Sequence, residues 1–305
     1  MPFSSEEAAA AFATVSSPDP FEESLEIAED FLADSLSGSR GAPEASRGLS
    51  AERVVVRGHD APEDEEFLET IIGGDDRQRI RDTETYPWRM ICQVEITWPS
   101  DSRGFVGTAW LVAPRTLVTA GHCVYDPQYG GWATELKITP GRDGSERPFS
   151  SFVSAAYSTT NHWFHNQSED HDFAAIHLDE DAAAQVAELG HFSVAVLPGR
   201  ELTGLNVNLS GYPVDKGGRQ MWHDAKRITG LTKKRVFYDM DSFGGQSGAP
   251  VFAWENPDDA PQVIGIHAYG TGATPRHMDI TANSAPRITP DVLAVLREWI
   301  AKDTP

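Results

Sequence analysis

The chain is poor in basic residues, and this shortage restricts the partners it can have. Its 305 residues include 25 Lys and Arg against 46 Asp and Glu, which gives a formal net charge of −21. Such an excess of negative charge disfavours a nucleic-acid partner, because phosphate backbones are themselves anionic. Apolar runs long enough to cross a bilayer are also missing, so we expect no membrane span.

Cysteine is scarce as well, with only Cys92 and Cys123. A chain of this length does not need a disulfide for stability, so we interpret the two as separate thiols, although a bridge between them stays open. The first seven residues, 1–7, lack the basic region and the apolar stretch of an ordinary signal peptide. Export would then need another route or a leader outside this sequence.

The N-terminal region, residues 1–69, differs in composition from the remainder. It holds 17 acidic residues, four Arg and no Lys. Apolar spacing after Pro20 predicts one amphipathic helix that ends at Gly38, and residues 53–57 could form a strand. We interpret 1–69 as an acidic pro-segment or regulatory tail that packs little by itself; a disordered, solubilising tail is the alternative.

Residues 70–305 consist mainly of short apolar runs separated by Gly, Pro, Asp and Ser, which predicts an all-β domain. Helical spacing occurs only at residues 179–189 and 290–300, and Thr289 with Pro290 is typical of the start of a helix. We therefore expect a β-sandwich or barrel that ends in a C-terminal helix. The expected strands are 89–98, 107–120, 135–139, 173–178, 207–211, 235–240, 249–254 and 263–269.

Three separate segments carry residues suited to nucleophilic catalysis. Ser247 lies between glycines ahead of an apolar strand, His122 follows an apolar strand and small residues, and Asp172 begins an apolar run. Each alone has an ordinary structural explanation as a loop serine, a packed histidine or a turn residue. Together they occur in the order His, Asp, Ser, which is that of chymotrypsin. Their spacing suits two successive β-barrels with the site between them.

These segments resemble the chymotrypsin-fold serine proteases, in particular the bacterial glutamyl endopeptidases. The resemblance rests on residues 119–123, 171–176, 210–213 with 215–216, and 240–248, and residues 71–77 resemble the mature N-terminus of that branch. It implies that 70–305 form two six-stranded antiparallel β-barrels of the chymotrypsin type. It also implies a serine endopeptidase that acts on protein or peptide substrates and needs no cofactor.

The same resemblance implies roles for individual residues. Ser247 is expected to be the nucleophile, His122 the general base and later acid, and Asp172 the group that orients the imidazole. The backbone amides of Gly245 and Ser247 are expected to form the oxyanion hole. Gln246 occupies the position of the aspartate that pairs with the new amine in trypsin-like zymogens, so activation must differ here.

The specificity pocket is expected to be lined by Asp241, Ser242, His267, Tyr269 and Gly270. An imidazole and a hydroxyl suit an acidic side chain, which favours cleavage after Glu, then Asp. Against this, the carboxylate of Asp241 lies where trypsin-like enzymes bind Arg or Lys, so that specificity is the alternative.

Processing of the chain is a further expectation. Glu69 directly precedes Thr70, so a Glu-specific protease could remove residues 1–69, the pro-segment acting in cis until then. An inactive protease-fold binding protein is an alternative of a different class. The resemblance implies an extracellular location, but the missing signal peptide leaves a cytoplasmic one open.

Two other features of the sequence bear on cysteine and metal chemistry. Relatives often bridge the cysteine beside the catalytic His to one sixteen residues earlier, which is Gly107 here, so Cys92 is the remaining candidate. His162, His165 and His171 lie near Asp170, but no zinc-type spacing is present, and we expect no metal site.

Overall fold

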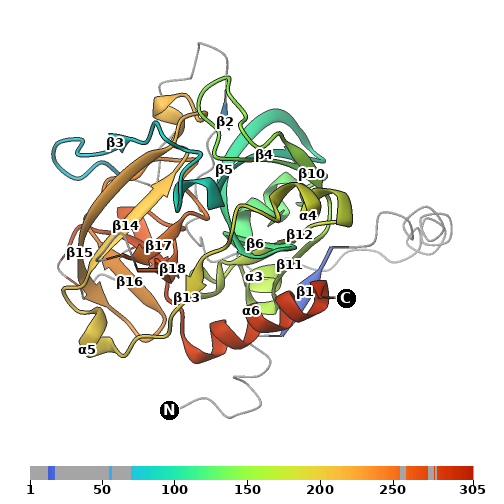
Figure 1. The fold of residues 1–305 in the computed structure, drawn as a ribbon. Helices are drawn as coiled ribbons and strands as arrows, with labels where there is room; N and C mark the ends of the chain where they lie inside the picture. Colours follow the sequence, from blue (N-terminus) through green and yellow to red (C-terminus); the bar gives the residue numbers. More distant parts are fainter. Residues whose placement is uncertain are drawn as a thin grey trace.

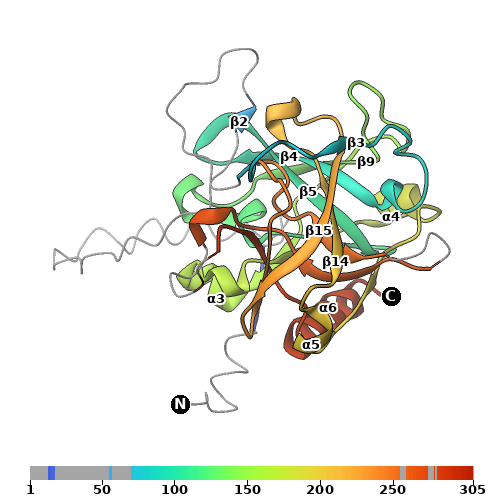
Figure 2. The same cartoon turned by 90° about the vertical axis from the view of Figure 1, so that its left-hand side faces the viewer.

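A computed structural model describes residues 13–17, 55–56, 70–254, 259–273, 278 and 280–304. Their strands form two large sheets that curl into barrel-like halves (Figures 1 and 2). The expected all-β class with a C-terminal helix is confirmed. The helix predicted after Pro20 lies outside the described residues.

The first half is a nine-stranded sheet in the order β1-β11-β12-β6-β5-β4-β9-β10, with β2 paired to β5. Two of its strands, β1 and β2, come from the region before residue 70, so two short pieces of that region pair with the first half. The strands are β1 (Thr14–Ser16), β2 (Val55–Val56), β4 (Ile91–Trp98), β5 (Asp101–Ala113), β6 (Thr116–Thr119), β9 (Glu135–Pro140), β10 (Phe152–Ser154), β11 (Tyr157–Thr160) and β12 (Ala174–His177).

The second half is an eight-stranded sheet in the order β13-β18-β17-β14-β15-β16-β19, with β3 paired to β15. Figure 2 shows β14 and β15 side by side on the face of this half. The strands are β3 (Gln78–Arg79), β13 (Ser193–Val194), β14 (Asn206–Gly211), β15 (Trp222–Leu231), β16 (Arg235–Tyr238), β17 (Pro250–Ala253), β18 (Gln262–Ile266) and β19 (Asn283–Pro286). A separate two-stranded sheet pairs β7 (Tyr125–Asp126) with β8 (Gly131–Trp132).

The helices are short except for the last one. The side chain of Thr289 accepts a hydrogen bond from the amide of Val292 at 3.2 Å, so it caps the last helix as predicted. The α-helices are α3 (Asn161–Asn166), α4 (Glu180–Val186), α5 (Gly199–Leu202) and α6 (Pro290–Asp303). The 3₁₀ helices are η1 (Trp88–Met90), η2 (Gly121–Cys123), η3 (Pro127–Tyr129), η4 (Glu169–His171), η5 (Val214–Lys216) and η6 (Thr271–Ala273).

The structure differs from the sequence-based expectation at one long strand. Residues 107–120 were expected to form a single strand, but they contain the end of β5 and all of β6. The two strands pair through Ala113 and Thr116, so a tight turn at residues 114–115 reverses the chain. A proline at position 114 suits such a turn because its backbone angle φ is already restricted.

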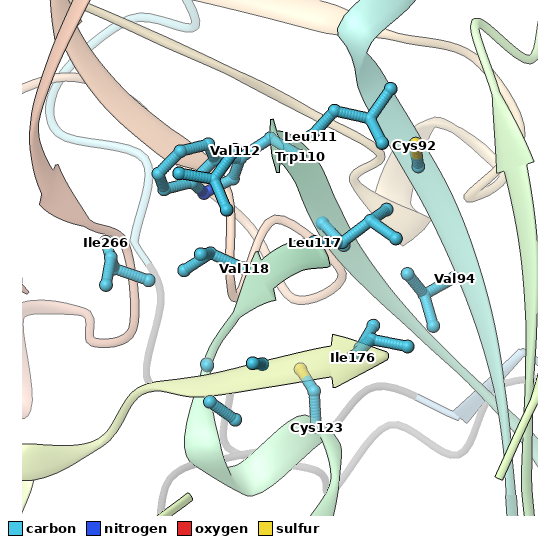
Figure 3. Packing of buried hydrophobic residues seen from close by; sticks show 14 of the residues in the cluster. Cys92, Val94, Trp110, Leu111, Val112, Leu117, Val118, Cys123, Ile176 and Ile266 are labelled. Atoms are coloured by element: carbon cyan, nitrogen blue, oxygen red, sulfur yellow. The ribbon is translucent and has the colours of Figure 1, made fainter. Parts of the chain in front are cut away.

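Both cysteines lie in the packed core and are not bonded to each other (Figure 3). Cys92 is on β4, whereas Cys123 ends η2 directly after His122, and each is at most 2% exposed. The interpretation of two separate thiols is therefore confirmed, and Cys92 does not replace the bridge that is missing at Gly107. Burial raises the pKa of the Cys92 thiol above its ordinary range, which keeps it protonated and unreactive.

Candidate active site

The structure brings His122 and Asp172 together. His122 lies in η2, directly after β6, and Asp172 directly follows η4; both are buried. The Nδ1 atom of His122 is 2.7 Å from Oδ2 of Asp172, and the backbone amide of His122 donates to Oδ1 at 2.9 Å. Two contacts to one carboxylate fix both the position and the tautomer of the imidazole.

The other ring nitrogen, Nε2 of His122, is buried and has no hydrogen-bond partner in the described part of the chain. It is therefore the atom available to exchange a proton with a substrate or nucleophile. Burial lowers the pKa of His122, but the charge and hydrogen bond of Asp172, together with Cys123, raise it by more, so the pKa lies above its ordinary value. The pair thus favours the imidazolium that a general base becomes after taking up a proton.

Tyr269 has a contact that the sequence analysis did not anticipate. We expected it in the specificity pocket, but its hydroxyl donates to Oδ2 of Asp172 at 2.5 Å, the same oxygen that His122 contacts. The ring is 2% exposed, and the guanidinium of Arg235 lies 4.9 Å above it. Burial and these two contacts therefore fix the side chain of Tyr269 against Asp172. Only a tertiary structure could reveal this contact, because 97 residues separate Tyr269 from Asp172.

Ser247 lies near the residue that follows His122, since Sγ of Cys123 is 3.8 Å from the carbonyl of Ser247, and contacts between the two halves hold it there. The amide of Thr108, on β5, donates to the carbonyl of Ser247 at 2.9 Å. The hydroxyl of Thr108 donates to the carbonyl of Gly245 at 2.8 Å and accepts from the amide of Tyr212 at 3.1 Å. One residue of the first half therefore fixes the serine loop of the second.

Two glycines in this loop have conformations and surroundings that exclude a side chain. Gly245 has φ of +95°, and a Cβ there would lie 2.5 Å from the carbonyl oxygen of Tyr212. Gly248 has φ of +87°, and its Cβ would lie 2.2 Å from the carbonyl oxygen of Thr108. The glycines therefore set the sharp bend that presents Ser247. The amide of Gly245 meets no acceptor among the described residues, which suits an oxyanion donor.

His267 and Ser242 are both fully buried in the second half. The hydroxyl of Tyr238 is 2.6 Å from Nδ1 of His267 and orients the imidazole. Burial, together with the neighbouring charge of His122, lowers the pKa of His267 to about 3, so the ring is neutral near pH 7. The hydroxyl of Ser242 has no hydrogen-bond partner in the described ranges. A buried, unsatisfied donor is costly unless a ligand completes it.

Asp241, expected in the specificity pocket, binds backbone amides of the segment that follows Thr70. Its two carboxylate oxygens accept hydrogen bonds from the backbone amides of Ile72 at 2.7 Å and Asp76 at 2.8 Å. The side chain is fully buried, and Lys226 lies 3.7 Å away. The carboxylate therefore anchors the segment that follows Thr70. The fifth expected pocket residue, Gly270, is buried directly before η6.

Arg77 forms a buried ion cluster that sequence reasoning missed. Its guanidinium, fully buried, contacts the carboxylates of Asp75 and Asp215 and lies 3.5 Å from Oε1 of Gln246. These charges hold the pKa of Asp75 well below its usual range, because Arg77 donates to it directly. Gln246, next to the nucleophile candidate, thus contacts a side chain of the 70–77 segment rather than a terminal amine. In the sequence, the opposite charges of Asp75 and Arg77, two residues apart, were the one local indication of an ion pair here.

Thr70 also contacts the second half. Its amide lies 3.3 Å from Oδ1 of Asn283, and its carbonyl accepts from Nδ2 of the same residue at 2.9 Å. Its hydroxyl is 3.0 Å from that of Thr271, and its carbonyl lies 3.5 Å from the amide of Ser242. Thr70 is therefore placed next to the residues expected to line the specificity pocket.

The described residues contain no group of three His, Cys, Asp or Glu side chains that could hold a metal ion. The rings of His162 and His171 lie 4.7 Å apart, but Nε2 of His171 faces Lys234 at 3.4 Å. Within the same ranges, each helix is too short or too polar for a bilayer crossing.

Two curled β-sheets, with a His–Asp pair and a glycine-flanked serine at their junction, define the class of chymotrypsin-fold serine proteases. A family model described as Trypsin matches residues 71–287, and the chain belongs to this family.

Among curated relatives, a protein named glutamyl endopeptidase from Bacillus licheniformis is 32% identical over 235 residues, which cover 76% of this chain and 69% of that protein. A protein from Bacillus subtilis named extracellular metalloprotease is also 32% identical, over 231 residues that cover 75% of this chain and 69% of the relative. A solved structure described as Glu endopeptidase in complex with MPD aligns with a TM-score of 0.64 at 23% identity. It covers 76% of this chain and 100% of its own.

Proposed function

We propose that this trypsin-family protease cleaves peptide bonds after Glu, and less rapidly after Asp, through an acyl-enzyme at Ser247. His122 takes the serine proton on Nε2 and returns it to the leaving amine, while Asp172 holds the ring. The amides of Gly245 and Ser247 bind the oxyanion. The observation that carries this proposal is the His122–Asp172 contact through Nδ1, which leaves Nε2 without a partner.

The preference for Glu is supported by the chemistry of the pocket candidates. The hydroxyl of Tyr238 lies 2.6 Å from Nδ1 of the neutral His267; in the tautomer that carries the proton on Nε2, the ring accepts from Tyr238 and can donate to a carboxylate. The unsatisfied hydroxyl of Ser242 is a second donor. Cleavage after Arg or Lys would need the charge of Asp241, whose two oxygens already bind the amides of Ile72 and Asp76.

We further propose that the chain is a precursor, activated by a cut between Glu69 and Thr70. The cut would leave the new amine of Thr70 beside Asn283 and close to Ser242. A positive charge there would strengthen binding of a glutamate carboxylate. The anchoring of Ile72 and Asp76 by Asp241 supports a fixed position for this terminus.

Hydrolysis of matched peptides tests the specificity. Peptides that differ only in Glu, Gln or Arg before the scissile bond are compared by kcat/KM with the processed protein. Gln is the matched control because it keeps the shape of Glu without its charge. We expect a preference for Glu over Gln of roughly 100-fold or more, since polar groups built for a carboxylate stay unpaired with the amide. A preference for Arg would contradict the proposal.

Two further measurements test the mechanism and the processing. Ser247→Ala should remove peptide cleavage, while circular dichroism stays that of the parent protein; residual cleavage at the parent rate would refute the nucleophile. N-terminal sequencing of the processed protein should begin at Thr70, and a start elsewhere would refute the proposed processing site. An active-site serine reagent that fails to label the processed protein would favour an inactive binding protein.

A further inference from the structure

The outer edge of β11 is occupied by a strand from the far N-terminal region. Residues 13–17 run antiparallel to it, with Thr14, Val15 and Ser16 opposite Thr160, Thr159 and Ser158. Beyond the paired strand, the amide of Ser17 donates to the carbonyl of Tyr157 at 2.9 Å, and the amide of Asn161 donates to the carbonyl of Ala13 at 2.6 Å. An edge strand with unsatisfied backbone groups is therefore completed in cis.

Side chains of this segment also bind the C-terminal helix, and Figure 1 shows β1 lying beside α6. The Nζ atom of Lys302 donates to the hydroxyl of Ser16 at 2.9 Å, and Thr14 lies 3.3 Å from Glu298. The hydroxyl of Ser16 also lies 2.9 Å from that of Ser158. Side chains of α6 and β11 thus contact the side chains of Thr14 and Ser16, so the site favours this sequence over an extended backbone of any other sequence.

The Ser16–Ser158 contact continues into a buried chain of polar groups. The hydroxyl of Ser158 is 2.8 Å from Nε2 of His177, whose Nδ1 is 2.8 Å from the carboxylate of Asp303. The carboxylate in turn accepts from Thr116 at 2.5 Å. These groups are satisfied by one another, so the surface that meets Ser16 is preformed.

The docked strand also supports the element next to the catalytic histidine. Asn161 is the first residue of α3, so the carbonyl of Ala13 satisfies an amide that the helix itself cannot. Trp163 in the same helix packs against Gly121, where a Cβ would lie 2.7 Å from the indole. Its ring lies 6.1 Å from that of His122. The contacts of β1 therefore reach the catalytic pair through one short helix.

We propose that the β11 edge and the end of α6 form a strand-binding surface for residues 13–17, and that this segment stays bound after the chain is cut at Glu69. The processed protease is then a complex of two chains, which rests on the proposed processing site. None of the contacts above involves residues 18–69, so the cut removes the covalent link but none of these bonds. Addition of a strand to a sheet edge is a known mode of peptide binding.

Limited proteolysis of the full-length Ser247→Ala protein tests the proposal, because this variant is not expected to cleave itself. A separate Glu-specific protease cuts the chain, and mass spectrometry identifies the fragments that end between Ser17 and Val55; these carry the tested strand without β2, which itself pairs with β5. Native mass spectrometry and gel filtration then ask whether the N-terminal fragment remains with the protease domain. We expect an equimolar complex, and a fragment that elutes alone would overturn the proposal.

Two proline variants provide the matched comparison. In the observed register, the backbone hydrogen-bonding groups of residues 13, 15 and 17 face β11, whereas the amide of Thr14 points away from it. Val15→Pro should lose the fragment, and Thr14→Pro should retain it, because proline is tolerated where an edge strand faces solvent. Equal retention by both variants would overturn the proposal.

Hydrogen exchange in the uncut Ser247→Ala protein gives a second readout. The amide of Asn161 should exchange at least about tenfold faster in Val15→Pro than in Thr14→Pro, because its acceptor is the carbonyl of Ala13. The core strands of both halves should keep their protection, which shows that the fold is intact. Unchanged protection of Asn161 in Val15→Pro would contradict the docking.

Discussion

Replacement of Tyr269 by Phe removes the hydroxyl that contacts the His122–Asp172 pair. This hydroxyl donates to Oδ2 of Asp172, which also meets Nδ1 of His122. A hydrogen bond to a charged group is worth about 1.5–3 kcal/mol, and catalysis loses only the part that differs in the transition state. We therefore expect kcat on a Glu peptide to fall about 3- to 30-fold, with KM within about twofold of the parent value.

The pH profile separates this positioning role from a structural one. Without the hydroxyl, more of the negative charge on Oδ2 acts on His122, and its pKa rises further. Because the base must be neutral to accept a proton, the acid limb of the kcat/KM profile should move to higher pH by roughly half a unit. The profile is measured from about pH 5 to pH 11, so that it covers both the ordinary pKa of His and the raised pKa of about 10 of His122.

Tyr157→Phe is the matched control. Tyr157 is also buried, and its hydroxyl donates to the carbonyl of Ser154 at 2.6 Å, away from the catalytic pair. Both variants should lose about 1 kcal/mol or more of stability, but only Tyr269→Phe should change kcat and the pH profile. A raised KM with unchanged kcat in Tyr269→Phe would refute the reasoning, because it would indicate that Tyr269 binds substrate in the specificity pocket.

Three other predictions concern stability and specificity. In Gly107→Cys, the new Cβ would lie 3.0 Å from Sγ of Cys123, so we expect a disulfide that adds about 3 kcal/mol and is lost with reductant; an unchanged Tm under oxidising conditions would contradict it. His267 binds a proton in the unfolded chain below its ordinary pKa of 6.5 but in the folded chain only below about 3, so stability should fall as the pH falls through this window. Urea unfolding of His267→Gln should show a flatter profile there, and an equally steep one would refute the assignment. Asp241→Asn should lower the Tm through its contacts to Ile72 and Asp76, yet leave the Glu-to-Arg ratio unchanged in peptide assays; a shift in that ratio would place Asp241 in the pocket.

Local patterns predicted the parts of the site that depend on neighbouring residues in the chain. His122 and Asp172 each border an apolar strand, and the strands of the first half bring these two points together. The glycines around Ser247 were visible as composition, and their conformations and close contacts explain why they are needed.

Other features could not be predicted because they depend on tertiary contacts. The strand β15 was missed since residues such as His223, Asp224 and Lys226 interrupt its apolar pattern, yet these side chains bind partners on β14, at residue 241 and at residue 76. The assignment of Asp241 to the pocket came from its position in the sequence alone. Its partners lie about 170 residues earlier, and no local pattern identifies them.

The contacts of Thr108 have a consequence for how the enzyme loses activity. A single side chain and its amide join the first half to the carbonyls of Gly245 and Ser247. A small slide of one half past the other would therefore pull on the serine loop before either barrel unfolds. Inactivation by heat or denaturant should then precede the loss of secondary structure. Activity would therefore measure whether the interface between the two halves is intact, and not the stability of either half.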